Sequence, residues 1–214
     1  GGGHIFKVSS DGNNLTQLTK ETGVFTQLAW SKKKNRIVFL KGSAQAYENG
    51  MGASTAFAQE ELAWIDASGG AIQVIDKSKG RSLPHFTNID DRIYLNKGNT
   101  LISIRWDGTD KKEHLKLTGI ETFGSQDVFG KDHRDDHTAM PTSEDGWREN
   151  KKASRASEIH ISPDGTSALA QINNDIYIVD IPRYGKTPSI SLAKAESASF
   201  PAMKLTVLGG EFPD

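Results

Sequence analysis

The residues best suited to chemistry form a short run of histidine and aspartate at positions 132–137. His133 and His137 are four residues apart, so on a helix they would share one face and could bind a metal ion, with Asp136 completing the ligand set. The alternative is a solvated loop, because residues 119–156 mix Gly, Pro, Ser and charge without apolar periodicity. We predict the loop, and therefore no metal and no catalytic residue in this chain.

Other catalytic patterns are absent from the sequence. It has no cysteine, which excludes a thiol nucleophile, a disulfide and a cysteine-ligated zinc. It has no Gly-x-Ser-x-Gly motif, which excludes the corresponding serine hydrolase arrangement. The 26 basic and 27 acidic residues are scattered and give a net charge of −1, which predicts no nucleic-acid partner. No apolar run approaches the roughly 18 residues of a membrane span.

The elements that must position any site repeat along the chain. The first half of the repeat is an apolar strand, a polar turn and a second apolar strand. Its three copies align without gaps at Ala29–Ser31 with Arg36–Phe39, His85–Thr87 with Arg92–Leu95, and His160–Ser162 with Ser167–Ala170. The second half is a strand ending in a turn, then another strand, and it begins at Ile5, Leu62, Leu101 and Ile176.

The spacing of the halves predicts the fold. Phe86 and Leu101 are 15 residues apart, and so are Ile161 and Ile176. Four strands in about 40 residues are typical of a propeller blade. The sequence therefore predicts an all-β, single-domain partial β-propeller over residues 1–214. It has a half blade at 3–19, four-stranded blades at 23–76, 83–118 and 157–206, and insertions at 42–59 and 119–156.

Some aromatic and basic side chains have two interpretations. Trp30, Trp64 and Trp106 lie at matching strand positions or near turns and are expected to pack between blades. Trp147 lies in the polar insertion and could cover a ligand, anchor the loop on a partner domain or be a loose surface residue. The triplet Lys32–Lys34 is predicted to be a solvated turn tip, with a phosphate contact as the alternative.

Two segments, Ile161–Gly165 and Ile5–Gly12, resemble TolB-type propeller repeats. Such repeats occur in TolB, in prolyl-oligopeptidase-like enzymes and in a group of amidohydrolases. Leu101–Lys116 is similar to the segment that the amidohydrolases carry before their final propeller blades. Lys204–Pro213 is similar to the segment that lies ahead of their catalytic barrel. The resemblance covers most of the chain outside the two insertions.

This resemblance implies the N-terminal propeller of a larger protein whose C-terminal barrel holds a divalent metal such as zinc. The family's metal site begins with a His-x-His pair. None of the six histidines here forms such a pair, so no ligand or catalytic residue can be assigned from the family.

The expected function follows from the resemblance. The chain is expected to be the non-catalytic propeller portion of an amidohydrolase-like hydrolase, which shapes substrate access and packs on a C-terminal domain outside residues 1–214. The alternative is a protein–protein interaction propeller of the bacterial cell envelope, as in TolB. We expect a periplasmic or secreted protein. Open blade edges further predict self-association.

Overall fold

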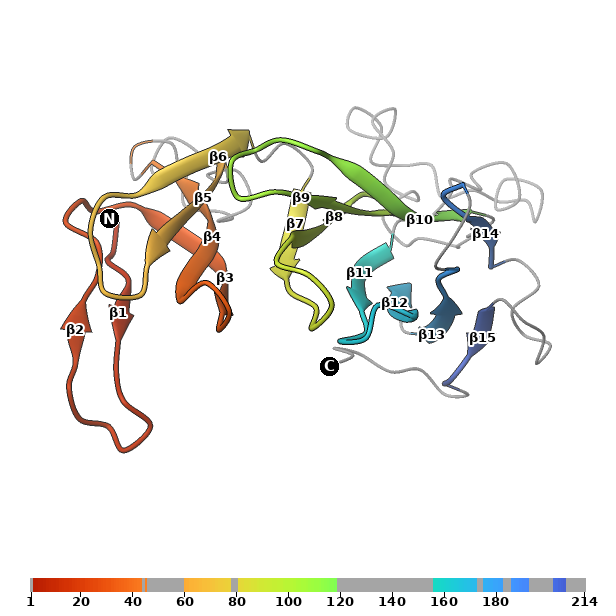
Figure 1. The fold of residues 1–214 in the computed structure, drawn as a ribbon, viewed down its shortest axis with the longest axis horizontal. Coiled ribbons are helices and arrows are strands. Elements are labelled where there is room, and N and C mark those ends of the chain that lie inside the picture. The colour runs from red at the N-terminus through yellow and green to blue at the C-terminus, as the bar shows by residue number, and fades with distance from the viewer. Residues whose placement is uncertain are drawn as a thin grey trace, which may run out of the picture.

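A computed structural model describes residues 2–43, 45, 60–77, 81–118, 156–172, 175–182, 186–192 and 202–206 of the chain. The elements within these residues are the β-strands β1 to β15, which form four separate sheets (Figure 1). The predicted all-β class is therefore confirmed. The insertion candidates His133, Asp136, His137 and Trp147 lie outside the described residues, as does most of 42–59.

Apart from one late strand of sheet II, β14 (Ser189–Ser191), the four sheets follow one another along the chain. The first sheet, called the ribbon below, has only two strands, β1 (Phe6–Lys7) and β2 (Thr16–Gln17). Sheet I contains β3 (Val24–Ser31), β4 (Arg36–Gly42), β5 (Glu61–Asp66) and β6 (Gln73–Lys77). Sheet II contains β7 (Arg81–His85), β8 (Ile93–Lys97), β9 (Thr100–Ile104), β10 (Lys112–Thr118) and β14 (Ser189–Ser191). Sheet III contains β11 (Ala156–Ile161), β12 (Ser167–Ile172), β13 (Asp175–Asp180) and β15 (Ala202–Lys204).

Consecutive strands pair antiparallel in each sheet, as the repeat predicts. Strand β14 is the exception. It pairs in parallel with the outer strand β10, so that Leu117 lies opposite Ile190. This three-residue strand carries no copy of the repeat, and its pairing depends on a strand about seventy residues earlier, which local pattern does not reveal.

Aspartate side chains form the same turn in each sheet and in the ribbon. The first carboxylate oxygen accepts a hydrogen bond from the backbone N–H two residues later, an arrangement that mimics a backbone turn. The pairs are Asp11 with Asn13 (3.0 Å), Asp66 with Ser68 (3.1 Å), Asp107 with Thr109 (2.9 Å) and Asp164 with Thr166 (3.1 Å). Hydrogen bonds of the turns lower the pKa of all four carboxyl groups.

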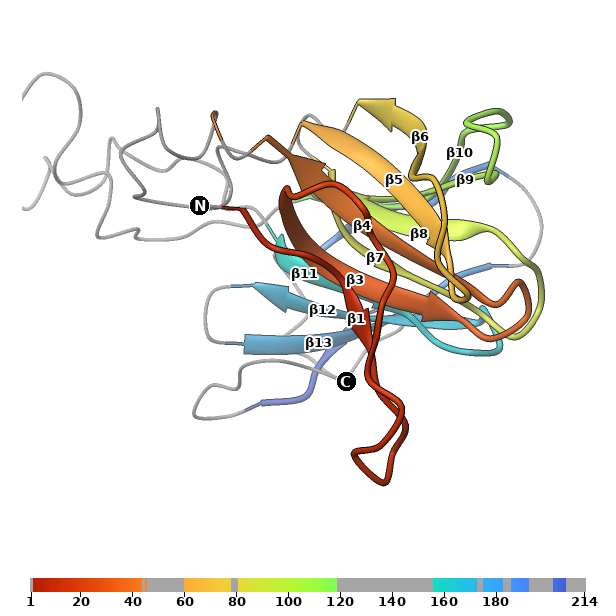
Figure 2. The ribbon, with the colours of Figure 1, turned by 90° about the vertical axis from the view of Figure 1, so that its left-hand side faces the viewer.

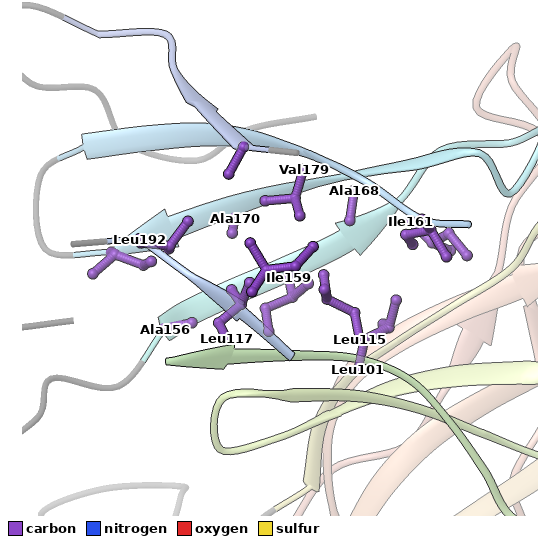
Figure 3. Close-up of a cluster of buried hydrophobic side chains, with 14 of the residues drawn as sticks. Leu101, Leu115, Leu117, Ala156, Ile159, Ile161, Ala168, Ala170, Val179 and Leu192 are labelled. Carbon is purple, nitrogen blue, oxygen red and sulfur yellow. The ribbon is translucent and has the colours of Figure 1, made fainter. Parts of the chain in front are cut away.

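Each pair of neighbouring sheets encloses its own apolar core. The core between the ribbon and sheet I is formed by Ile5, Leu18, Ile37, Phe39, Ala63 and Ile65. Between sheets I and II it contains Val38, Leu40, Leu62, Ile93, Leu95, Ile102 and Ile104. The core between sheets II and III joins Leu101, Leu115 and Leu117 to Ile159, Ile161 and Ala168 among others (Figure 3).

The first strands of the three larger sheets lie next to one another. Strand β3 packs on β7, and β7 packs on β11. The second strand of each sheet also reaches the first strand of the next, since β4 contacts β7 and β8 contacts β11. The sheets are therefore stacked in the order of the chain with their first strands along one side (Figures 1 and 2).

The tryptophan prediction is wrong at one of its three positions. Trp64 and Trp106 pack against the core between sheets I and II, with ring centroids 6.0 Å apart and edge to face. Trp106 also stacks on Phe86, and the Arg36 guanidinium lies 3.8 Å from the Trp64 ring centroid. Trp30, in contrast, is 50% exposed, because the two-stranded ribbon does not extend over β3.

The lysine triplet forms an exposed turn, as predicted, but two of its three side chains bind the next sheet. Lys33 Nζ donates to the backbone oxygens of Asn88 (2.7 Å) and Asp90 (3.0 Å). Lys34 forms an ion pair of 2.8 Å with Asp91. The triplet therefore joins the first turn of sheet I to the first turn of sheet II, which the isolated pattern of three lysines could not show.

One glycine marks a close approach between sheets. Gly108, in the turn between β9 and β10, has a φ of +82°, and a Cβ there would lie 2.6 Å from the carbonyl oxygen of Ile75 on β6. Gly12 has the same φ in the equivalent turn of the ribbon, but a Cβ there would have no neighbour within 4 Å. The two positions share the same positive φ but differ in what surrounds them.

Candidate functional site

The titratable side chains that the structure gathers lie where sheet II meets sheet III. They belong to β7, the turn before β8, β8, β10 and β11, and the sequence patterns assigned none of them a chemical role. The group consists of His85, Asp90, Arg92, Tyr94, His114, Glu158 and His160, together with the buried hydroxyl of Ser103. The candidates His133, Asp136 and His137 are outside the described residues, so the structure does not relate them to this group.

Side chains connect the first strands across the gaps between sheets. Strands β3 and β7 each contain a bulge, in which Gln27 and Leu83 have φ values of +52° and +54°. The side-chain oxygen of Gln27 accepts the N–H of Leu83 at 2.7 Å. His85 Nε2 accepts the N–H of Ile161 at 3.1 Å in the same way. A side chain of β3 thus accepts a backbone N–H of β7, and a side chain of β7 accepts a backbone N–H of β11.

His85 and His160 occupy the same position of the repeat on neighbouring first strands. Their ring centroids are 5.1 Å apart, and His160 Nε2 lies 3.2 Å from a carboxylate oxygen of Glu158. His85 Nδ1 lies 2.7 Å from the Leu83 carbonyl oxygen, so its partners assign a neutral ring with the proton on Nδ1. Burial, together with the His160 charge, lowers the pKa of His85 to about 4. Because both ring nitrogens are engaged, His85 has no lone pair available for a metal ion.

Arg92 is the centre of a second, more deeply buried network. It is 8% exposed; its Nε donates to Ser103 Oγ at 2.7 Å, and its Nη1 pairs with Asp110 at 2.7 Å. Its Nη2 bonds the backbone oxygen of Asp110. Ser103 Oγ in turn lies 2.7 Å from His114 Nε2. Burial and, next, the Arg92 charge lower the pKa of His114, which favours the neutral form of its ring.

Asp90 organises the turn that precedes β8. Its carboxylate accepts hydrogen bonds from the Thr87 hydroxyl (3.1 Å), the Arg92 N–H (3.2 Å) and the Tyr94 hydroxyl (3.0 Å). Burial and the Asp90 charge raise the pKa of Tyr94 to about 12. Tyr94 therefore stays a hydrogen-bond donor at physiological pH and does not act as a base.

The chemistry available to this group is limited by access. Ser103 and His114 have the contact of a nucleophile and its base. However, Ser103 is 0% exposed and its oxygen already accepts the Arg92 bond, so no substrate can reach it. Among the described residues, no set of three or more His, Asp or Glu side chains could hold a metal ion. The group therefore joins sheets II and III and orders the turns of sheet II.

An open cavity of about 600 Å³ lies where β13 ends, beside β14, and its wall includes Asp180, Pro188 and Ser189. Asp180 is its one titratable lining residue, so it contains no acid–base pair. Within the described ranges, no helix has the length and apolar character required to cross a membrane.

The repeat pattern of the sequence contains a signal for the histidine pair. The aligned strands begin with Ala29, His85 and His160, so the two histidines were already at equivalent positions. Equivalent positions on neighbouring first strands come close together once the sheets stack. The Arg92 network had no such signal, because its members come from β9, β10 and two turns, and their contacts depend on strand register.

Replacing Arg92 with lysine is expected to lower the free energy of unfolding by about 1–2 kcal/mol, because lysine cannot reproduce a fork that bonds Ser103 and Asp110 together. Arg105→Lys is the matched control. Arg105 binds the same carboxylate at 3.1 Å but is exposed, so its change should stay within about 0.5 kcal/mol. Urea unfolding of both variants measures the difference. Equal effects would show that Arg92 contributes no more than a surface charge.

Comparisons with known proteins bear on the fold alone. No protein-family model matches the chain, and no curated protein matches it. Among solved structures, the chain is similar to an oligogalacturonate lyase in complex with manganese, with a TM-score of 0.52 and 11% sequence identity. The match covers 84% of this chain and 45% of that chain, so the present chain spans less than half of its length. That protein is a TolB-like β-propeller, which agrees with the stacked, all-β arrangement described here.

Proposed function

We propose that residues 1–214 are part of a β-propeller in which sheets I, II and III are three blades and the ribbon is the outer half of a fourth. Propellers arrange four-stranded sheets around an axis with the first strands innermost. Three features support this arrangement: the packing of β3, β7 and β11, the bonds between these strands and the similarity to a propeller protein.

The proposed role of this part is structural, within a larger amidohydrolase-like hydrolase. The observation that carries this proposal is that the described side chains suited to catalysis, Ser103, His114 and His85, are engaged in bonds inside and between sheets. The assignment to a hydrolase rests on the resemblance of Leu101–Lys116 and Lys204–Pro213 to amidohydrolase segments. The propeller would shape substrate access, and a separate barrel would hold the divalent metal, zinc for example, and perform hydrolysis.

Metal content and activity test this proposal. Purified residues 1–214 are expected to hold no stoichiometric zinc and to hydrolyse no amide substrate, whereas the product of the whole reading frame should do both. Elemental analysis and amide hydrolysis measure the two properties, with the double variant His133→Ala/His137→Ala as control. About one zinc per chain in residues 1–214, lost in that variant, would overturn the proposal. A whole protein that binds envelope proteins without metal or hydrolysis would favour the TolB-type role.

A further inference from the structure

The face of sheet I that is directed toward the ribbon is covered over only part of its width. Ile37 on β4 and Ile65 on β5 are buried against the ribbon. Trp30 lies directly opposite Ile37 in the β3–β4 pair, so it belongs to the same face. Trp30 and Leu28 on β3 are nevertheless each 50% exposed. The apolar interface with the ribbon therefore continues across β3 without a cover.

The residues equivalent to Leu28 and Trp30 in sheets II and III are shielded from solvent by the preceding sheet. Leu28 corresponds to Pro84 in sheet II and to Ile159 in sheet III, and both are buried. Trp30 corresponds to Phe86 and to Ile161; Phe86 packs against the core between sheets I and II, and Ile161 is 7% exposed. Only in sheet I are both positions open to solvent.

In sheets II and III, the first strand is covered by equivalent strands of the preceding sheet. The first strand of sheet II is contacted by β3 and β4, and the first strand of sheet III by β7 and β8. In both cases, the first two strands of one sheet cover the first strand of the next. The ribbon corresponds to the third and fourth strands of a sheet, since Ile5–Val8 aligns with Leu62–Ile65 and with Leu101–Ile104.

The ribbon also has a free strand edge on the appropriate side. Strand β1 pairs with β2, and no other described strand pairs with it. The N–H of Leu18 donates to the oxygen of Ile5, so Ile5 and Leu18 form a hydrogen-bonded pair of the β1–β2 ladder. Hydrogen-bonded and non-hydrogen-bonded pairs alternate in an antiparallel ladder, so the next pair, Phe6 with Gln17, is not hydrogen-bonded. The N–H and C=O of Phe6 therefore point toward the unpaired edge. Gly3 bridges Gly23 just before β3, which places the start of β1 beside the start of β3.

From these observations we propose that the β1 edge, with Leu28 and Trp30, is the docking site of an antiparallel β-hairpin joined to the N-terminal end of β1. Its second strand pairs with β1, and its two strands cover Leu28 and Trp30. In sheet II the second strand, β8, enters the third, β9, through the two residues Gly98 and Asn99, so the same short connection can join the hairpin to β1. The proposal rests on the stacked arrangement of the proposed function and not on its hydrolase assignment.

The hairpin must present small or apolar side chains on the face directed at sheet I. In the existing stacks, this face is formed by Ala29 and Val38 toward sheet II and by Tyr94 toward sheet III. Backbone bonds to Phe6 supply strand pairing, and apolar contacts on Trp30 and Leu28 supply burial, which together define a strand-addition site. The chain's own hairpins have this chemistry, so one of them can serve as a probe.

The experiment extends the full chain with a copy of residues 81–99 in place of Gly1–Gly3. Asn99 precedes Thr100 as Gly3 precedes His4 in the aligned repeat, so the copied turn enters β1 in register. The expected results are two. Exchange of the Phe6 amide slows by at least ~10-fold, and acrylamide quenching attributable to Trp30, measured against a Trp30→Phe variant, is lost.

Matched variants decide between pairing and unspecific effects. The same extension with Leu95→Pro in the copied strand should restore fast Phe6 exchange, because proline cannot take part in a ladder next to β1. Burial of Leu28 and Trp30 by the extension should also raise the urea midpoint of the chain. In the extended chain, Leu28→Ser/Trp30→Ser should remove this rise, whereas Val74→Ser, at a 52% exposed position on β6, should preserve it. All three positions are at least half exposed in the unextended chain, so serine is expected to be tolerated there, and the same substitutions in the unextended chain control for effects on folding.

Two results would overturn the proposal. In one, the extension and its proline control give the same Phe6 exchange and the same Trp30 quenching. In the other, the unextended chain protects Phe6 and Trp30 in a concentration-dependent manner, which would make a second copy of the chain the occupant. Neither readout depends on metal or hydrolysis, so failure of the hydrolase proposal would leave this test unaffected.

Discussion

Gly108→Ala is expected to lower the free energy of unfolding by about 2–5 kcal/mol, whereas Gly12→Ala should cost about 1–2 kcal/mol. Both glycines have a φ of +82°, so any other residue suffers the same backbone strain at either position. At Gly108 the added Cβ would also lie 2.6 Å from the Ile75 carbonyl oxygen. Ile75 lies in a bulge of β6, but the strand pairs on either side of it, Leu62 with Asp76 and Ala63 with Val74, hold its backbone in place, so sheets I and II must separate locally.

Equilibrium unfolding in urea of the two alanine variants and the parent chain measures this difference. Because strain at positive φ is common to both variants, subtracting one from the other isolates the inter-sheet contact. The m-values should remain similar, since the same surface is exposed on unfolding. Equal losses at the two positions would show that sheets I and II do not approach as closely at Gly108 as described.

The stability of the chain is expected to fall by about 3 kcal/mol as the pH is lowered from 6.5 to 4, because of His85. Burial lowers the pKa of this side chain to about 4, compared with its ordinary value of 6.5. Between these values the unfolded chain binds a proton that the folded chain does not, so unfolding becomes more favourable as the pH decreases. Protonation would also remove the lone pair that accepts the Ile161 N–H.

His85→Gln is the variant that tests this dependence, since its amide oxygen can accept the same bond without titrating. Urea unfolding at several pH values should show a steep slope for the parent chain and a shallower one for the variant. The lowered pKa values of Asp11, Asp66, Asp107 and Asp164 also stabilise the fold, but that contribution disappears below the ordinary value of 3.8. The two windows are separate, so identical slopes between pH 4 and 6.5 would contradict the role of His85.

Much of the strand pattern could be predicted from the sequence, because each half-unit carries its own turn and alternation. Pairs such as Ile161 with Ala168 and Ile93 with Ile104 follow from strands joined by short turns. Strand β14 could not be predicted, because its three residues pair with a distant strand. Each local signal therefore succeeded where the partner was the next strand along the chain.

Contacts between sheets were less predictable than the sheets themselves. Trp30 and Phe86 occupy equivalent positions, yet Trp30 is exposed, because the preceding ribbon has only two strands. The repeat predicted where Trp30 lies in its sheet, but not that the neighbouring ribbon would have too few strands to cover it. His85 and His160 show the converse case, since repetition did place them together and only the chemistry of their partners, a carbonyl, an amide and Glu158, needed the structure.

The separate cores between neighbouring sheets make the molecule a linear array of interfaces. Three clusters join the ribbon to sheet I, sheet I to sheet II and sheet II to sheet III. In such an array, stability is close to a sum of nearest-neighbour terms, and opening starts at the ends. Sheets I and II are both held from two sides, but the ribbon covers sheet I only in part, so the amides of sheet II should exchange last and those of the ribbon first. Damage at one junction would then divide the array into two parts that unfold at different denaturant concentrations.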